Sequence, residues 1–431
     1  MTNQENQAAN DEGLRRDIGF WGSAFLAFNG VVGAGIFALP ETLYAQFGTF
    51  SPWLFPLFGG LILLIAVPFG KVAAHYPTSG GPVLYAAPYG PIVSFQAGWL
   101  YYVARVTALA ANANVFMTYA ASLWPAVGEG IGRAIGIAAL CALLAFINIV
   151  GVKRAIRTLD ALTLLKATPL IFMALWGIIL SVGSVSFPSS LPPLSEVEVA
   201  ALLTLYAFVG FENSVVPAGE TANPQRTIPR GIVLTLLATV TLYFIVQLAY
   251  VGVMTPGAGG DAPLVTFGSV VAGPVGALLL TAAALFSIGG NLFATTTSTS
   301  RVTFALARDG MLPRWFSRVN ESYQTPANSI IFIGAVGALL AISGSFVWLA
   351  VVSTLSRLFV YGITISRLPS LRREQGRAAH LFAHLWAGAG LIVCIWAALQ
   401  SEWPAWRMLL VLTGVGLLLY ALARRRRAQA A

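Results

Sequence analysis

The sequence predicts an all-α integral membrane protein with 12 transmembrane helices, arranged as a 5+5 inverted repeat with broken helices 1 and 6 and two peripheral helices. Three observations predict this fold. Of the 431 residues 57% are hydrophobic and only 10% are charged, whereas ordinary soluble domains are about 25% charged. Twelve segments approach the roughly 20 apolar residues that a helix needs to cross a bilayer. Glycine and proline interrupt the first and sixth segments, which occupy corresponding positions in two groups of five.

The spans follow from apolar length, in chain order. The first repeat, 20–182, contains expected spans at 20–47, 52–72, 92–124, 134–152 and 160–182. The second repeat, 199–365, contains expected spans at 199–218, 231–254, 273–307, 328–343 and 346–365. Residues 381–423 contain the two peripheral spans, at 381–398 and 405–423. The apolar stretch that begins near 329 is too long for one helix, and the Ser-Gly-Ser sequence at 343–345 supplies a turn.

Basic residues orient the chain. If the polar tail 1–19, expected to be disordered, is cytoplasmic, then 19 of the 25 lysines and arginines lie on the cytoplasmic side, and only Arg133 and Arg407 lie outside. The protein is therefore expected in a bacterial-type inner membrane, with both termini on the cytoplasmic side. The basic tail 424–431 follows a span directly, so its four arginines indicate contact with the anionic lipid bilayer rather than with nucleic acid.

Composition and motifs exclude several classes of function. The two cysteines lie in apolar runs and the three histidines are scattered, so neither a disulfide framework nor a metal site is expected. The sequence lacks the common hydrolase, metalloprotease and phosphate-loop motifs. We therefore expect no enzyme and no cofactor. A channel would need a selectivity ring, which nothing in the sequence requires.

The stretch GVVGAGIFALP at 30–40 matches the glycine pattern of a dinucleotide-binding loop, but it has no preceding strand and no acidic residue about 20 positions on. It instead places Gly30, Gly33, Gly35 and Pro40 in the middle of a membrane span. One interpretation is close helix packing through small residues. The other is a break in the helix, whose free N–H groups and positive dipole end would suit a carboxylate.

A second interruption favours the break. Span 6 has Gly210 at its middle, Glu212 two residues later and Pro217 beyond. Paired interrupted spans in two halves indicate a substrate site at the interface between repeats. Because each half has an odd number of spans, the second half is inverted relative to the first.

Four segments resemble the amino acid–polyamine–organocation permeases, which share the LeuT-like fold. They are GVVGAGIFALP in span 1, YAFVGFENSVVPAGETANPQRTIPRGI in and after span 6, STSRVTFALARDGMLPRWFSRVN after span 8, and LTLLKATPLIF in span 5. Together with the span count they cover residues 20 to about 365. The resemblance implies a transporter and leaves its substrate open.

The resemblance also implies a substrate site. The N–H groups of Gly33, Ala34 and Gly35 would bind an α-carboxylate, although Ala34 stands where relatives often have serine. Backbone carbonyls would receive the α-amino group; they are those of Val31, Tyr206 and Val209. The Tyr206 ring would be a gate, or alternatively a packing residue. The remaining expected contacts are Phe208, Gly210 and Asn291, with Ser287 one turn before Asn291.

Ionisable residues inside spans are candidates for coupling or gating. A lysine matching Lys166 takes the place of a sodium ion in the resembling family, so we expect proton coupling; the alternative is a fixed structural cation or a residue that reaches the cytoplasmic interface. The hydroxyl tract TTTSTS at 295–300 supports sodium instead. Arg105 and Glu212 are expected to pair, directly or through water, as a structural tie or a gate. Arg357 is expected to contact backbone carbonyls, and Arg301 to reach the cytoplasmic interface.

The combined prediction is a secondary active transporter that works by alternating access and takes up a neutral or apolar amino acid with protons. Apolar rings expected at the cavity favour this substrate; they are Phe37, Phe208 and Phe211. A cationic amino acid held by Glu212 is the second choice. An amino acid or amine exchanger, an exporter and a sodium symporter remain alternatives. Of Asn112 and Asn114, at most one is expected to face the cavity.

Overall fold

The computed structural model describes residues 18–76, 81–150, 155–182, 188, 190–215, 218–372 and 376–428, with the backbone alone at 155–166, 219 and 426–428. Most of the expected tail 1–19, the end of the basic tail and the side chain of Lys166 lie outside these residues. Ile18, at the end of the expected tail, forms an isolated parallel bridge with Thr221.

The described elements are α- and 3-10 helices. The long ones are α4 (Ser51–Ala73), α6 (Pro91–Ala121), α7 (Gly130–Val150), α8 (Ala155–Leu180), α11 (Pro224–Val253), α12 (Pro263–Arg308), α13 (Ala327–Ser343), α14 (Phe346–Ile365), α16 (Arg377–Leu399) and α17 (Trp403–Ala428). The short α-helices are α2 (Phe20–Val31), α3 (Gly35–Phe47), α5 (Pro82–Ala86), α9 (Leu194–Val199), α10 (Ala201–Tyr206) and α15 (Leu368–Leu371). The 3-10 helices are η1 (Gly48–Phe50), η2 (Ala87–Tyr89), η3 (Pro125–Val127), η4 (Phe211–Ser214), η5 (Ala218–Glu220) and η6 (Arg314–Ser317).

Each expected span coincides with one helix or with an interrupted pair. The turn expected at 343–345 separates α13 from α14, and the Ser345 hydroxyl caps α14 by accepting from the N–H of Trp348. In α12 the backbone leaves helical geometry at Ala272 and Gly273, where φ of Gly273 is +61°. Glycine adopts this left-handed conformation without a steric penalty. The eighth expected span therefore begins where α12 resumes, near residue 274.

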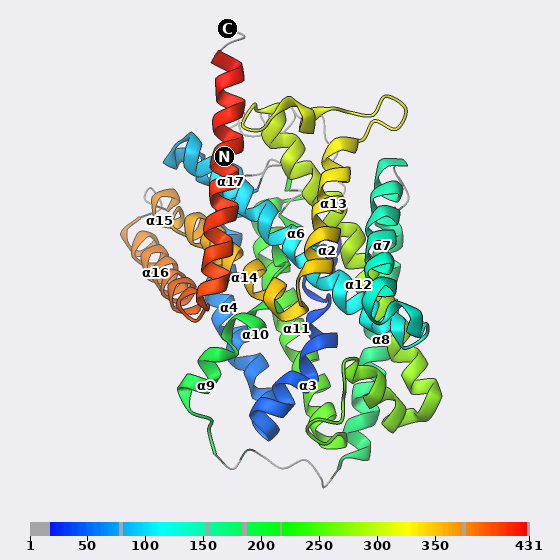
Figure 1. The fold of residues 1–431 in the computed structure, drawn as a ribbon. Coiled ribbons are helices and arrows are strands. Elements are labelled where there is room, and N and C mark those ends of the chain that lie inside the picture. Colours follow the sequence, from blue (N-terminus) through cyan, green and yellow to red (C-terminus); the bar gives the residue numbers. More distant parts are fainter. Residues whose placement is uncertain are drawn as a thin grey trace.

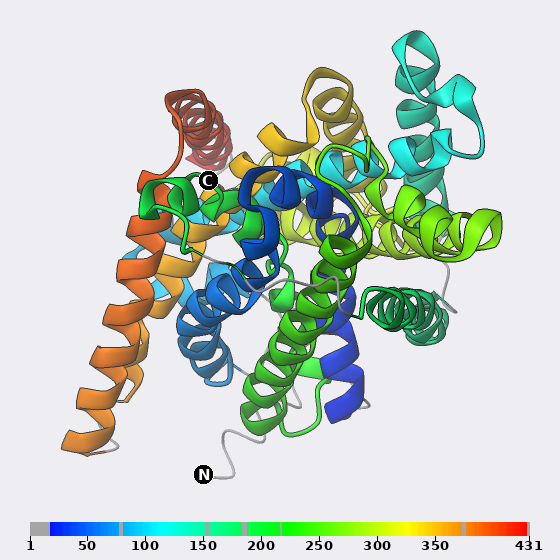
Figure 2. The ribbon, with the colours of Figure 1, turned by 90° about the horizontal axis from the view of Figure 1, so that it is seen from below.

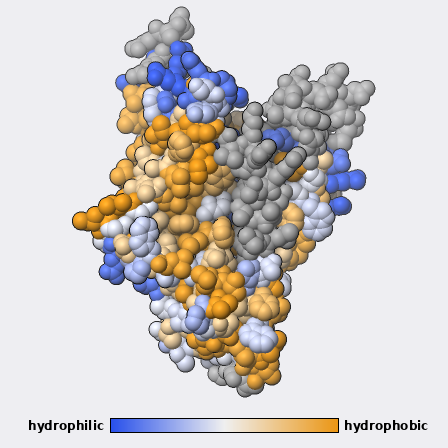
Figure 3. Space-filling view, turned by 90° about the vertical axis from the view of Figure 1, so that its right-hand side faces the viewer, coloured by the Kyte–Doolittle hydropathy of each residue, from blue (hydrophilic) through white to orange (hydrophobic). Residues whose placement is uncertain are grey.

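Seven of the described helices or helix pairs are long and apolar enough to cross a membrane. Helices α16 and α17 lie at one edge of the bundle and α7 lies at the other (Figures 1 and 2). Their outer faces carry large exposed apolar side chains, such as Phe146, which is 64% exposed, and Ile392, which is 68% exposed. Figure 3 shows a broad apolar surface below a hydrophilic end. Apolar side chains on this scale suit contact with lipid.

Helix α6 lies at the centre of the bundle, where it packs against α12, α13 and α14. On the other side of the core α11 packs against α2 and α4. The interrupted segments α2–α3 and α10–η4 lie between these groups, so their breaks face the interior rather than lipid. This position fits the rule that non-helical backbone at membrane depth must be buried in protein or line a cavity.

Candidate functional site

Span 1 is interrupted between α2 and α3, as predicted. The N–H of Val32 still donates to the carbonyl of Phe28 at 2.8 Å, and the N–H of Gly33 turns back to the carbonyl of Val31 at 2.9 Å. The next three N–H groups, of Ala34, Gly35 and Ile36, have no hydrogen-bond partner among the described residues. They lie at the N-terminus of a 13-residue helix, where free donors and the helix dipole favour an anion.

This geometry changes one of the predicted contacts. The N–H of Gly33 is engaged within the turn, so it is not free to bind a carboxylate as expected. The N–H of Ile36 is free instead and was missed from the sequence. The position of α3 could have indicated it, because the first N–H groups of any helix lack partners within the helix.

Span 6 is interrupted between α10 and η4. The backbone turns through Ala207 to Gly210, and φ of Gly210 is +113°. The N–H of Gly210 donates to Oε2 of Glu212 at 2.9 Å. The predicted break at Gly210 is confirmed, but the chain resumes as a four-residue 3-10 helix rather than as an α-helix.

The two interruptions touch each other. A Cβ atom added to Gly30 would lie 2.2 Å from the carbonyl oxygen of Gly210, and one added to Gly210 would lie 2.2 Å from that of Gly30. A Cβ on Gly35 would lie 2.9 Å from Cα of Ala207. Close helix packing and a break in the helix were the two interpretations of these glycines, and both occur. Gly30 permits the close contact, and the helix is interrupted three residues later.

A small cavity of about 20 Å³ lies where the interruptions meet, which is room for about one water molecule. Eight of the nine predicted substrate contacts line it: Val31, Gly33, Ala34, Gly35, Tyr206, Val209, Gly210 and Asn291. Gly30, Ala108 and five residues with polar side chains complete the lining; the polar ones are Arg105, Asn112, Asn213, Thr295 and Arg357.

The apolar rings expected at the cavity lie elsewhere. Phe208 packs against Phe55 and Tyr243, whose ring centroids are 6.2 and 5.7 Å away. Phe37 packs edge-on against Tyr119, and Phe211 lies 5.3 Å from Tyr361. The expected position at the inner cavity is wrong for all three rings, because they pack against rings of neighbouring helices, which span periodicity alone does not predict. A substrate contact by Phe208 stays a prediction.

A chain of amides connects the elements around the cavity. The Tyr206 hydroxyl donates to Oδ1 of Asn112 at 2.9 Å, and Nδ2 of Asn112 donates to Oδ1 of Asn291 at 2.8 Å. Nδ2 of Asn291 then donates to the carbonyls of Asn29 and Gly30, at 2.9 and 3.0 Å. One turn earlier on α12, the Ser287 hydroxyl donates to the carbonyl of Val32 at 3.1 Å. Side chains of α12 thus satisfy carbonyls at and after the end of α2, and side chains of α10 and α6 bond to Asn291 in series.

Asn114 faces away from this cavity, as expected if only one of the two asparagines reaches it. Its Nδ2 donates to the carbonyls of Ala341 and Gly344, at 3.0 and 3.1 Å, and so ties α6 to the turn between α13 and α14.

Glu212 pairs with Arg357 rather than with Arg105. Nε of Arg357 lies 3.0 Å from Oε1 of Glu212, and both residues are almost fully buried. The Tyr361 hydroxyl donates to Oε2 of Glu212 at 2.9 Å. The predicted direct pairing with Arg105 is therefore wrong. Arg357 also donates to the carbonyl of Ala104 at 3.1 Å, which confirms its predicted backbone contact but makes that contact secondary.

Arg105 bonds only to neutral groups among the described residues. Its Nε donates to the Thr299 hydroxyl at 2.8 Å, and NH2 donates to the Ser298 hydroxyl at 2.6 Å. NH1 donates to Oδ1 of Asn213 at 2.5 Å and to the Tyr101 hydroxyl at 3.2 Å. The Arg105 side chain is 2% exposed.

Most hydroxyls of the 295–300 tract also donate hydrogen bonds within α12. Those of Thr296, Thr297 and Ser298 donate to carbonyls four residues earlier in the helix, and Thr297 also donates to Oδ1 of Asn148. Arg301 donates to the carbonyl of Thr297 and is exposed.

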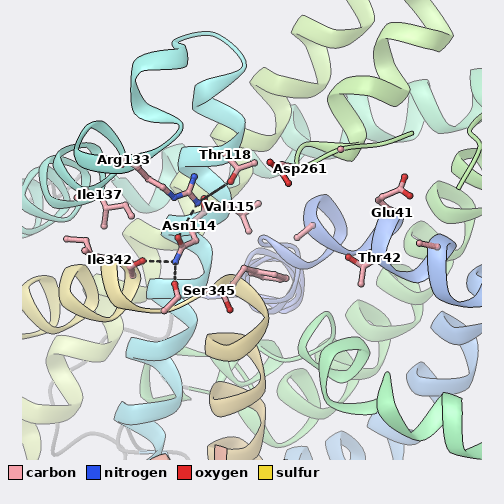
Figure 4. Close-up of a pocket in the computed structure, with 18 residues that line it drawn as sticks. Glu41, Thr42, Asn114, Val115, Thr118, Arg133, Ile137, Asp261, Ile342 and Ser345 are labelled. Carbon is pink, nitrogen blue, oxygen red and sulfur yellow. Dashed lines mark hydrogen bonds between the residues drawn. The ribbon is translucent and has the colours of Figure 1, made fainter. Parts of the chain in front are cut away.

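A larger cavity of about 620 Å³ opens beside the small one, between α3, α6, α7, α13 and α14 (Figure 4). Arg133 lines it and donates to the carbonyl of Asn114 and the hydroxyl of Thr118, at 3.0 and 3.2 Å. Phe346 lines this outer cavity, and its ring meets the ring of Tyr206 edge-on, with centroids 5.7 Å apart. The two rings therefore lie between the outer and the inner cavity.

Within the described part of the chain no cluster of three histidine, cysteine, aspartate or glutamate side chains could bind a metal ion.

Comparison with known proteins is consistent with this architecture. A solved structure of MhsT in complex with L-phenylalanine superposes with a TM-score of 0.63 over 88% of this chain and 98% of MhsT, at 14% sequence identity. That likeness shows a LeuT-like fold. An uncharacterized transporter of Mycobacterium tuberculosis is 28% identical over 95% of this chain and 92% of its own length. The branched-chain amino acid permease BcaP of Bacillus subtilis is 25% identical over 96% of this chain and 94% of its own.

The serine/threonine exchanger SteT of Bacillus subtilis is 26% identical over 77% of both chains. These relatives are transporters, not enzymes. Residues 18–422 match the amino acid permease family. The chain is an integral membrane protein that belongs to the amino acid permeases of the amino acid–polyamine–organocation family.

Proposed function

We propose that this permease is a secondary active transporter that carries a neutral amino acid by alternating access, with the substrate bound where spans 1 and 6 are interrupted. The observation that carries the proposal is the row of free N–H groups at Ala34, Gly35 and Ile36, of which the first two belong to residues that line a polar cavity. Such a row would hold an α-carboxylate. The carbonyl of Val209, which has no hydrogen-bond partner among the described residues, is a candidate acceptor for the ammonium group.

The same proposal includes the membrane topology. Residues 20–182 and 199–365 would be two inverted repeats of five spans, and 381–423 would form two peripheral spans. Both tails, 1–19 and 424–431, would lie on the cytoplasmic side of a bacterial-type inner membrane. The match between expected spans and described helices supports this count of 12.

The lining of the inner cavity supports a neutral substrate. Glu212 is occupied by Arg357, Tyr361 and the N–H of Gly210, so it is not free to hold a cationic side chain. The guanidinium groups of Arg105 and Arg357 line the cavity and oppose a cationic side chain. The amides and hydroxyls there suit a small or polar neutral side chain, since the apolar rings that favoured an apolar substrate lie elsewhere.

Proton coupling through Lys166 is part of the proposal, because the sequence places this lysine within a span, and a lysine removed from water can exchange protons near neutral pH. Exchange remains the second candidate, since SteT carries that name and both modes would use one site. Uptake into proteoliposomes with and without a pH gradient would separate them: symport responds to an inward proton gradient, whereas exchange requires amino acid inside. Lys166→Met should abolish the response to the gradient.

A proline substitution tests the carboxylate site itself. Ala34 has φ of −68°, which proline adopts without strain, so Ala34→Pro deletes one free N–H with little change to the backbone. Losing a hydrogen bond to a charged group corresponds to about 10- to 100-fold weaker binding. Ala34→Gly keeps the N–H and is the matched control.

Substrate can be identified by a thermal-shift screen of the common amino acids, because a bound ligand stabilises the folded state. If Ala34→Pro binds the identified amino acid as tightly as the wild type, the proposed site is wrong.

A further inference from the structure

Arg105 is a permanent positive charge in the middle of the bundle. Guanidinium stays protonated in proteins and has five N–H donors but no acceptor. Four of its donations go to two hydroxyls of α12, the Asn213 amide of η4 and the Tyr101 hydroxyl of its own helix. Among the described residues no carboxylate forms an ion pair with Arg105, and a buried cation of this kind is costly to keep in a membrane span and so indicates a function.

The two α12 hydroxyls are hard oxygen ligands of the kind that bind an alkali cation. In this structure Ser298 and Thr299 both accept from Arg105. A second cation about 4 Å from the guanidinium would bind roughly 1000-fold more weakly at an effective dielectric constant near 20. The same oxygens therefore cannot serve sodium while Arg105 holds them.

Arg105 also connects three elements that surround the site. It belongs to α6, its hydroxyl partners belong to α12, and Asn213 lies in η4, directly after the interruption of span 6. Gly210, three residues before Asn213, touches Gly30 of α2. The position of the Arg105 guanidinium thus sets where the second half of span 6 meets span 1.

We propose that Arg105 is the fixed cation of the transport site, which occupies the Ser298 and Thr299 hydroxyls in place of sodium and positions the interrupted span 6 through Asn213. This inference rests on the proposed transport function. It assigns to Arg105 a positioning role that differs from the proton exchange proposed for Lys166, and it excludes coupling by sodium at these hydroxyls.

The experiment measures amino acid uptake into proteoliposomes in sodium and in choline buffers. Wild-type uptake should be equal in both. Arg105→Ala should lower uptake about 10- to 100-fold, the loss expected for removing a charged hydrogen-bond partner. Guanidinium chloride at millimolar concentration should restore part of the uptake of Arg105→Ala, because the free ion fits the vacated space. It should not restore Arg105→Gln, whose side chain fills that space.

Arg105→Lys should be partly active. It keeps the positive charge, but an ammonium group lacks the planar set of donors with which the guanidinium reaches both hydroxyls and the Asn213 amide. Arg301→Gln, on the exposed face of the same tract, is the control and should behave like the wild type. If Arg105→Ala does not fold, Asn213→Ala provides the second test: it leaves the cation and its hydroxyl partners, and should lower uptake while leaving it insensitive to sodium.

Three results would overturn the inference while leaving amino acid transport intact: sodium-dependent uptake by the wild type, normal uptake by Arg105→Gln, or a guanidinium effect equal in Arg105→Ala and Arg105→Gln. Absence of any amino acid uptake or counterflow by the wild type would instead overturn the proposed function, and this inference with it.

Discussion

The two interrupted spans differ in how they end. Span 1 resumes as a 13-residue α-helix whose first N–H groups are free, whereas span 6 resumes as a four-residue 3-10 helix whose glycine N–H is already bound to Glu212. Span 6 therefore has a carboxylate bound at its interruption, whereas the carboxylate in span 1, that of Glu41, accepts from Tyr250, Gly257 and Gly259 and not from the free N–H groups. The difference favours span 1 as the proposed place of a substrate carboxylate, whereas the carbonyl of Val209 in span 6 suits an ammonium group.

Removing the internal carboxylate of span 6 should have the largest effect. Glu212→Ala leaves Arg357 buried without its partner, and breaking a buried ion pair costs about 3 to 5 kcal/mol of stability. Thermal unfolding of the purified protein measures this loss. Glu321→Ala, in an exposed loop, is the control. An equally small change in both variants would show that the Glu212 carboxylate does not hold span 6.

Substituting the glycine of span 6 should have the next largest effect. Gly210→Ala places a Cβ 2.2 Å from the carbonyl oxygen of Gly30 at a positive φ, and overpacking of this kind costs about 1 to 3 kcal/mol. We expect lower thermal stability and loss of amino acid binding by isothermal titration. Gly60→Ala in α4 meets nothing within 4 Å and should be neutral. A neutral Gly210→Ala would mean that the two interruptions do not need to touch.

Tyr206→Phe should have a moderate effect on the amide chain that joins the spans. It deletes the bond to Asn112 and leaves an amide oxygen buried with one fewer donor, at a cost of about 1 to 3 kcal/mol. The dissociation constant of the substrate should rise while its dependence on pH stays unchanged. Tyr323→Phe, exposed on a loop, serves as the control. Unaltered binding by Tyr206→Phe would assign Tyr206 to packing alone.

Ala34→Ser should have the smallest effect and sharpens the assignment to span 1. A serine at the start of α3 adds a hydroxyl beside the free N–H groups, and one neutral hydrogen bond is worth about 0.5 to 1.5 kcal/mol. Binding should tighten by about 2- to 10-fold. Ala87→Ser, on an exposed 3-10 helix, should leave binding as it is. Weaker binding by Ala34→Ser would place the carboxylate elsewhere.

The breaks could be predicted because their cause is local. Glycines in the middle of an apolar span mark an interruption without knowledge of any neighbour, and the Ser-Gly-Ser turn marks the boundary between α13 and α14 in the same way. The helix ends therefore agreed closely with the expected spans.

The partners of the buried charges could not be predicted from the sequence. Arg105, Glu212 and Arg357 lie on three segments that are far apart in the chain, and depth in the membrane does not distinguish the two arginines. The orientation of α6 and α14 about their axes decides the partners: Arg357 forms the ion pair with Glu212, and Arg105 donates a hydrogen bond to Ser298. The free N–H of Ile36 was missed for a related reason, because the first turn of α3 begins two residues after Gly33.

The direct contact between Gly30 and Gly210 leaves only about 20 Å³ of free volume at the proposed binding place. An amino acid at the proposed site would have to move these two backbones, or the side chains that line the cavity, apart. Part of the substrate's binding free energy would then be used to move these groups. Tight binding of the substrate and its rapid transport therefore oppose each other. The best-carried amino acid is accordingly expected to be a weak binder.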